Sequence, residues 1–119
     1  MHNNLFSHLI DLNKTSHFIE ASAIVSTDGL VMASTLPHSM DADNVGAMSA
    51  AMLSVGTRGS NEFVGGALEQ MLIKGTRGYI LMTLISKELI LTVMAKPTVK
   101  LDQLFIEIKQ SAEKIIAIN

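Results

Sequence analysis

The sequence DADNVGAMSAAMLSVG, residues 41–56, limits how the rest of the chain can be arranged. Its apolar residues recur at steps of three and four, which predicts one helix with an apolar stripe. The residues of this stripe are Val45, Met48, Met52 and Val55. Most other positions are glycine, alanine or serine, and no residue between Asp43 and Arg58 is charged. A helix that is apolar or small on every side is normally covered on more than one side.

Two covers are therefore needed for this helix, and one of them can be a sheet of the same chain. A chain of 119 residues has few elements for the second cover, and closed two-fold homodimers are the commonest small oligomers. We therefore expect a second copy of the chain against this helix. A helix buried wholly within its own domain is the alternative.

The composition fits a single domain spanning residues 1–119, with 48% hydrophobic residues to build a core. The net charge of -2 argues against nucleic-acid binding, because a nucleic-acid footprint is usually basic. The absence of cysteine excludes disulfides and thiolate metal sites. No apolar run reaches the roughly 18 residues of a membrane helix, and the first residues do not resemble a signal peptide. We expect a cytoplasmic protein without membrane insertion.

Strand and helix patterns flank the central helix on both sides. Asp28-Gly29 lies between two strand-like runs, which is a strong hairpin signal. After the central helix, short links join three further apolar runs, so these runs must be antiparallel neighbours. The expected elements are a helix at 4–14, strands at 21–26, 30–35, 68–74, 79–84 and 89–94, and a helix at 99–118.

The end of the central helix is the least regular part of the pattern. Four glycines between residues 56 and 66 each disfavour a helix. Phe63 and Val64 nevertheless offer one more apolar turn. We expect the helix to continue to about Glu62.

The element order is helix, two strands, helix, three strands, helix. This order predicts an α+β fold, a three-layer α/β/α sandwich around a five-stranded antiparallel sheet. The strand at 68–74 carries Glu69, Gln70 and Lys74, which is typical of an edge strand. We expect the terminal helices together on one face of the sheet. The central helix is expected alone on the other face, where it leaves room for a helix of a second copy.

No group of residues in the sequence has the spacing of a catalytic or metal site. The four histidines show no paired spacing, so no metal site is expected. Asp41-Ala42-Asp43 lacks the rest of a calcium loop and is better explained by helix capping. Gly-Thr-Arg-Gly, at 56–59 and at 75–78, is not a phosphate loop, because no Gly-Lys-Ser/Thr follows it. We therefore predict a protein that is not an enzyme and that holds no metal or cofactor.

Three blocks of the sequence together resemble one known family. They are AIVSTDGLVMAS at 23–34, the alanine- and methionine-rich helix at 45–55, and GALEQMLIKGTRGYILMTLISKELILTVMA at 66–95. The blocks and their spacing are similar to the Roadblock/dynein-light-chain domain family. The resemblance implies homo- or heterodimers in which the central helices pack side by side and the third strands pair into one continuous sheet. It also implies that single-domain bacterial and archaeal members use the central-helix face to contact a Ras-like small GTPase.

Carried onto this sequence, the resemblance assigns two sets of site residues. The expected dimer interface is Ala47, Ala50, Ala51, Ser54, Leu68, Gln70, Met71 and Ile73. The expected GTPase-binding residues are Asn44, Ala47, Ala51 and Arg58. The substitution Met71→Pro is expected to weaken the dimer, because it removes an N–H donor from the pairing edge.

The leading hypothesis is a homodimeric interaction module that binds a Ras-like small GTPase and modulates its nucleotide cycle. One alternative is a scaffold dimer that anchors a larger assembly without affecting GTP hydrolysis. Another is a small-molecule sensor with an apolar pocket beneath the central helix, lined by flexible methionine side chains.

Overall fold

The computed structural model describes the backbone of residues 2–118 and the side chains of residues 5–117. Three helices and five strands follow one another in the predicted order. They are α1 (His2–Thr15), β1 (Ile19–Ser26), β2 (Val31–Thr35), α2 (Ala42–Gly59), β3 (Gln70–Gly75), β4 (Gly78–Leu84), β5 (Leu89–Ala95) and α3 (Leu101–Ile118). A π-helical segment, η1 (Ser60–Val64), extends α2.

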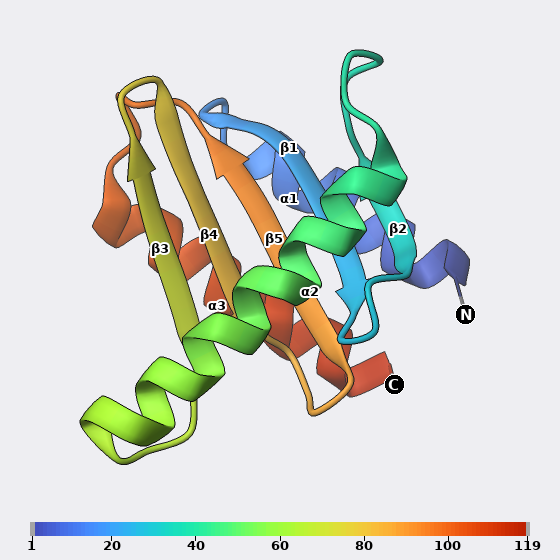
Figure 1. Ribbon diagram of the computed structural model, residues 1–119. Helices are drawn as coiled ribbons and strands as arrows, with labels where there is room; N and C mark the ends of the chain where they lie inside the picture. The colour runs from blue at the N-terminus through green and yellow to red at the C-terminus, as the bar shows by residue number, and fades with distance from the viewer. Residues whose placement is uncertain (1, 119) are drawn as a thin grey trace.

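The strands form one antiparallel sheet in the order β2-β1-β5-β4-β3. Helices α1 and α3 cover one face, and α2 crosses the other face alone (Figure 1). The three-layer sandwich is therefore confirmed, and so is the position of β3 at an edge of the sheet. None of the helices in the described part of the chain is both long and apolar enough to cross a lipid bilayer.

The larger apolar core lies between the sheet and the pair α1 and α3. Its innermost side chains include Leu9, Ile24, Leu91, Ile108 and Ile115, each with at most 1% of its surface exposed. They come from all three structural pieces that meet there, so the terminal helices and the central strands form one packed unit. This burial supplies most of the hydrophobic stabilisation of the chain.

Two glycines bring the first half of α2 close to the hairpin between β1 and β2. Gly29 occupies the turn with a φ of 94°, a backbone conformation that side chains rarely adopt. Gly46 is buried in α2, and a Cβ atom at this position would collide with the carbonyl oxygen of Gly29. The close contact between helix and hairpin therefore depends on glycine at Gly46.

The expected continuation of α2 to about Glu62 is confirmed. Asp41 caps the start of the helix and accepts a hydrogen bond from the N–H of Asp43 at 3.0 Å. The helix passes through its glycines and changes to π-helical pitch from Ser60 to Val64. It ends at Gly65, where φ is 85° and the N–H donates to the Ser60 carbonyl at 2.8 Å.

Only part of the apolar stripe of α2 lies against the sheet. Val45 is buried, but Met48 is 52% exposed and Val55 is 70% exposed. The residues of α2 that are buried are Val45, Gly46 and Ser49. The Ser49 hydroxyl lies 3.0 Å from the Thr92 hydroxyl on β5, so a buried hydrogen bond joins the helix to the sheet. Within the stripe, Val45 packs on the sheet and Met52 is half-buried, whereas Met48 and Val55 stay largely open to solvent.

Candidate interaction surface

The outer face of α2 points away from the sheet. Helical periodicity places Ala47, Ala51, Ser54 and Arg58 opposite the buried Ser49, and all four are exposed. Arg58 pairs with Glu62 at 3.8 Å, with both side chains largely in solvent, so the pair contributes little stability. The outer face is thus a strip of small side chains with a single cation near its C-terminal end.

Ala50 has a different environment from the other small residues assigned to the dimer interface. It is half-buried, and its Cβ atom lies beside Gly29 in the turn between β1 and β2. Asn44, by contrast, is exposed at the start of the helix. The structure therefore brings Ala47, Ala51, Ser54 and Arg58 together on one face and directs Ala50 towards the chain's own hairpin.

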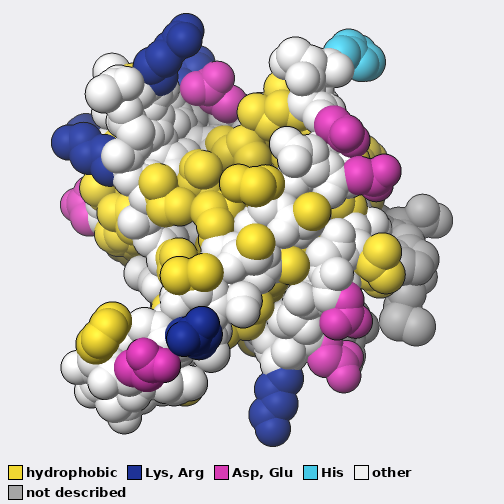
Figure 2. All heavy atoms as spheres, viewed as in Figure 1, with side chains coloured by type: hydrophobic (Ala, Val, Ile, Leu, Met, Phe, Trp, Pro, Cys, Tyr) yellow, Lys and Arg dark blue, Asp and Glu magenta, His cyan; other side chains and the backbone are white. Residues whose placement is uncertain are grey.

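A second side of α2, partly exposed, is apolar. We call Met48, Met52 and Val55 the methionine flank. Beside it lies a hollow of about 420 Å³, which we call the methionine hollow. Its apolar walls are Met40, Val45, Met48, Met52, Ile80 and Met94. Figure 2 shows apolar side chains gathered over the middle of this face, with charged groups towards its margins.

The free edge of β3 carries unpaired backbone groups. The Leu84 N–H donates to the Glu69 carbonyl at 3.0 Å, so these two residues form a hydrogen-bonded pair. Hydrogen bonding alternates along an antiparallel ladder, and the register runs from Gln70 opposite Thr83 to Gly75 opposite Gly78. The backbone groups of Met71 and Ile73 therefore face β4. Those of Gln70, Leu72 and Lys74 face the open edge.

This alternation corrects one expectation for the edge, and the bounds of β3 place Leu68 outside the strand. Met71→Pro would remove a hydrogen bond to β4, so the prediction that it removes a donor from the free edge is wrong. Leu68 lies before the strand, and its side chain approaches Gly56 of α2 instead of the edge. The sequence shows which strand lies at the edge. Which of its residues bond to β4 and which face the open edge depends on the register with β4.

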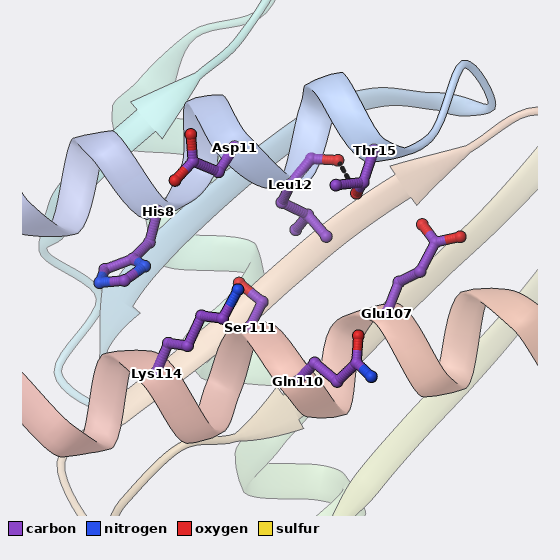
Figure 3. A pocket seen from close by; sticks show the side chains of 8 residues that line it. All are labelled: His8, Asp11, Leu12, Thr15, Glu107, Gln110, Ser111 and Lys114. Carbon is purple, nitrogen blue, oxygen red and sulfur yellow. Dashed lines mark hydrogen bonds between the residues drawn. The ribbon is translucent and has the colours of Figure 1, made fainter.

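The hollow between α1 and α3, on the opposite face, is much smaller and more polar than the methionine hollow. It has a volume of about 70 Å³ between α1 and α3, lined by side chains from both helices (Figure 3). His8 lies here, and the Thr15 hydroxyl donates to the Leu12 carbonyl at 2.8 Å. Within the described residues, no three histidine, aspartate or glutamate side chains are grouped as metal ligands would be. The α2 face with the β3 edge is the better candidate for an interaction surface.

Comparison with known proteins agrees with this architecture. The sequence model of the Roadblock/LC7 domain matches residues 6–95, which include every strand and α2. The chain belongs to the Roadblock/LC7 family. This membership confirms the resemblance seen in the sequence. The matched residues include α2 and β3, which form the α2 face and the free edge of the sheet.

Individual Roadblock/LC7 relatives show how far the likeness extends. The uncharacterized protein MJ1340 of Methanocaldococcus jannaschii is 44% identical over 109 residues, which are 92% of this chain and 94% of the relative. The solved structure of Myxococcus xanthus MglB superimposes with a TM-score of 0.91 at 14% identity, covering 98% of this chain and 88% of MglB. A Roadblock/LC7 domain from Streptomyces avermitilis gives a TM-score of 0.80 at 21% identity, covering 93% and 91%. At these identities the two structures support the fold of this Roadblock/LC7 chain.

Two features of the surface were not assigned from the sequence. The sequence predicts, as one alternative, a methionine-lined apolar pocket beneath the central helix, and the methionine hollow lies there; the exposure of Met48 and Val55 beside it does not follow from spacing. Leu72, whose backbone faces the free edge of β3 and whose side chain is 41% exposed, was not among the interface residues. Its exposure depends on the strand order, which becomes visible only in the folded sheet.

Proposed function

We propose that this protein is a homodimeric interaction module that binds a Ras-like small GTPase in the cytoplasm and modulates its nucleotide cycle. Membership of the Roadblock/LC7 family supports an interaction domain. The GTPase partner rests on the family resemblance of single-domain members. The assignment of the contact surfaces is argued from the α2 face and the β3 edge of this chain.

The observation that carries the proposal is the uncovered side of α2. The helix has no charged residue between Asp43 and Arg58, and Met48 and Val55 of its methionine flank are more than half exposed in the single chain. Large exposed apolar patches mark interaction sites in soluble proteins. A second copy beside α2 would remove this patch from water.

The β3 edge offers a way to place that second copy. A two-fold arrangement can pair β3 with the same strand of a partner through the outward backbone groups of Gln70, Leu72 and Lys74. The two sheets then become one continuous sheet, and the two α2 helices lie antiparallel on the same face. We assign their contact to the methionine flank, with Ala47, Ala51 and Ser54 beside it on the outer face.

The charges of α2 fit this antiparallel arrangement. Asp43 lies in the first turn of the helix and Arg58 in the last turn. Antiparallel helices place the acidic start of each beside the basic end of the other. Arg58 of one copy then lies beside Asp43 of the other, but Glu62 already pairs with Arg58 in its own chain, so these exposed charges contribute little to the orientation.

The GTPase contact is assigned to the outer face of the paired helices. Small side chains at Ala47 and Ala51 allow the backbone of a partner to approach closely. Asn44 and Arg58 supply polar groups at the two ends of this strip. A surface of this kind can reshape a nucleotide site by contact, without a catalytic residue of its own.

The proposal is tested with the purified protein as bait in a lysate of its source organism. One arm contains a non-hydrolysable GTP analogue and the other contains GDP. A small GTPase captured only with the analogue, and hydrolysing GTP at an altered rate when the purified protein is added, supports the proposal. Capture without any change in hydrolysis favours the scaffold alternative, and no captured GTPase in either arm contradicts the GTPase assignment.

A further inference from the structure

The C-terminal tip of α2 exposes two large apolar side chains. Phe63 is 86% exposed and Val64 is 84% exposed, more than any other large apolar side chain described. Both lie in η1, which overhangs the outer edge of β3 instead of packing on its own sheet (Figure 1). Together they form what we call the α2 tip.

The α2 tip is held in a defined shape by its own hydrogen bonds. The Gly65 N–H donates to the Ser60 carbonyl at 2.8 Å, and the Ser60 hydroxyl donates to the Gly66 carbonyl at 2.6 Å. The left-handed conformation of Gly65 then turns the chain back towards β3. An ordered end that presents Phe63 and Val64 to water has the form of a docking element.

We propose that the α2 tip of one copy inserts into the methionine hollow of a second copy, and that the exchange is reciprocal. The inference rests on the proposed homodimer. A partner joined at β3 places its sheet beneath the overhanging tip. Because the helices are antiparallel, the tip of one reaches the N-terminal half of the other, where Met48 and Met52 line the hollow.

The chemistry of the hollow suits this occupant. Its walls are mainly apolar, and methionine side chains adapt their shape to an aromatic ring and make favourable sulfur contacts with it. A two-fold axis requires each copy to supply both a tip and a hollow. The chain carries the tip and the hollow on the same side of the sheet, so each copy would bury the exposed apolar tip of the other.

Disulfide trapping tests the insertion directly, because the chain contains no cysteine. The double variant Phe63→Cys/Met48→Cys should form a covalent dimer under mild oxidation. The matched control is Phe63→Cys/Ile116→Cys, since Ile116 is as exposed as Met48 but lies on α3 behind the sheet. Neither this control nor the single variant Phe63→Cys should be trapped as a dimer.

The mass of the unmodified protein, measured by sedimentation, separates the possible failures. A dimer that the Phe63→Cys/Met48→Cys pair does not trap overturns the tip insertion and leaves the dimer standing. A monomer throughout the micromolar range overturns the dimer and the insertion together.

A second variant measures how much the α2 tip contributes. Phe63→Ser should weaken dimerisation at least about tenfold, because a buried phenylalanine side chain is lost from each half of the interface. The folded monomer should keep its stability, because Phe63 makes little contact with its own chain. Ile116→Ser is the matched control and should leave dimerisation unchanged. A wild-type dissociation constant in Phe63→Ser would overturn the proposal.

Discussion

The two faces of the sheet are covered very differently. Against α1 and α3, a large cluster of apolar side chains is almost completely removed from water. Against α2, the described core cluster contains only Ala23, Val25 and Val45 as fully buried members. The α1/α3 face therefore stabilises the chain, while the α2 face keeps apolar surface available for another molecule.

The largest difference is expected when an apolar side chain is shortened on each face. Leu9→Ala should lower the free energy of unfolding by about 2–5 kcal/mol, because it leaves a cavity in the α1/α3 core. Met48→Ala should change it by less than about 1 kcal/mol, because more than half of Met48 is already exposed. Both values come from urea denaturation at one low protein concentration, since dimerisation would add concentration-dependent stability. Similar losses of stability in the two variants would contradict the conclusion that the α1/α3 face, and not the α2 face, stabilises the chain.

An arginine placed on the methionine flank or on the outer face of α2 distinguishes the proposed dimer contact from the proposed GTPase contact. Met48→Arg should weaken dimerisation about a hundredfold or more, because it puts an unpaired charge into an apolar contact. Ala51→Arg, one turn further along but on the outer face, should affect dimerisation less and GTPase binding more. Sedimentation and binding to the captured GTPase are the measurements. If Ala51→Arg dissociates the dimer while Met48→Arg does not, the helices meet through the outer face instead of the methionine flank.

At the edge of the sheet, two neighbouring prolines should have opposite consequences. Leu72→Pro removes an N–H that faces the open edge, so it should weaken the dimer roughly tenfold while the monomer remains folded. Met71→Pro removes an N–H that faces β4, so it should destabilise the monomer itself. Circular dichroism and sedimentation distinguish the two outcomes. A destabilised Leu72→Pro monomer with an intact Met71→Pro monomer would show that the hydrogen-bond parity of β3 is reversed.

The contrast between the faces also explains what the sequence could predict. Spacing and turn signals identified every strand, the order of elements and the edge position of β3, because each depends on a local pattern or a short link. The orientation of α2 was not predictable in the same way. Its helix is small or apolar on all sides, so periodicity alone does not show that Ser49 faces the sheet and Val55 faces solvent. The roles of Leu68 and Leu72 likewise depend on the register with β4.

The smallest expected effect concerns how α2 is attached to the sheet. The Ser49 and Thr92 hydroxyls form a buried hydrogen bond in a layer that has few apolar contacts. Ser49→Ala should lower the free energy of unfolding by about 1–2 kcal/mol, because the Thr92 hydroxyl loses its partner. The matched control Ser54→Ala, on the exposed outer face, should stay within about 0.5 kcal/mol of the wild type.

The double variant Ser49→Ala/Thr92→Val shows whether the hydrogen bond or the loss of packing causes this effect. If the bond matters, the double variant should be less destabilised than the sum of the two single variants, because neither buried polar group is then left unpaired. Strict additivity would mean that the two hydroxyls do not depend on each other. In that case α2 would be held by packing at Gly46 and Val45. A measured coupling would show that a buried hydrogen bond helps to hold α2 on the sheet, as the hydrogen bonds of Asn13 to Ser22 and Thr35 join α1 to the other face.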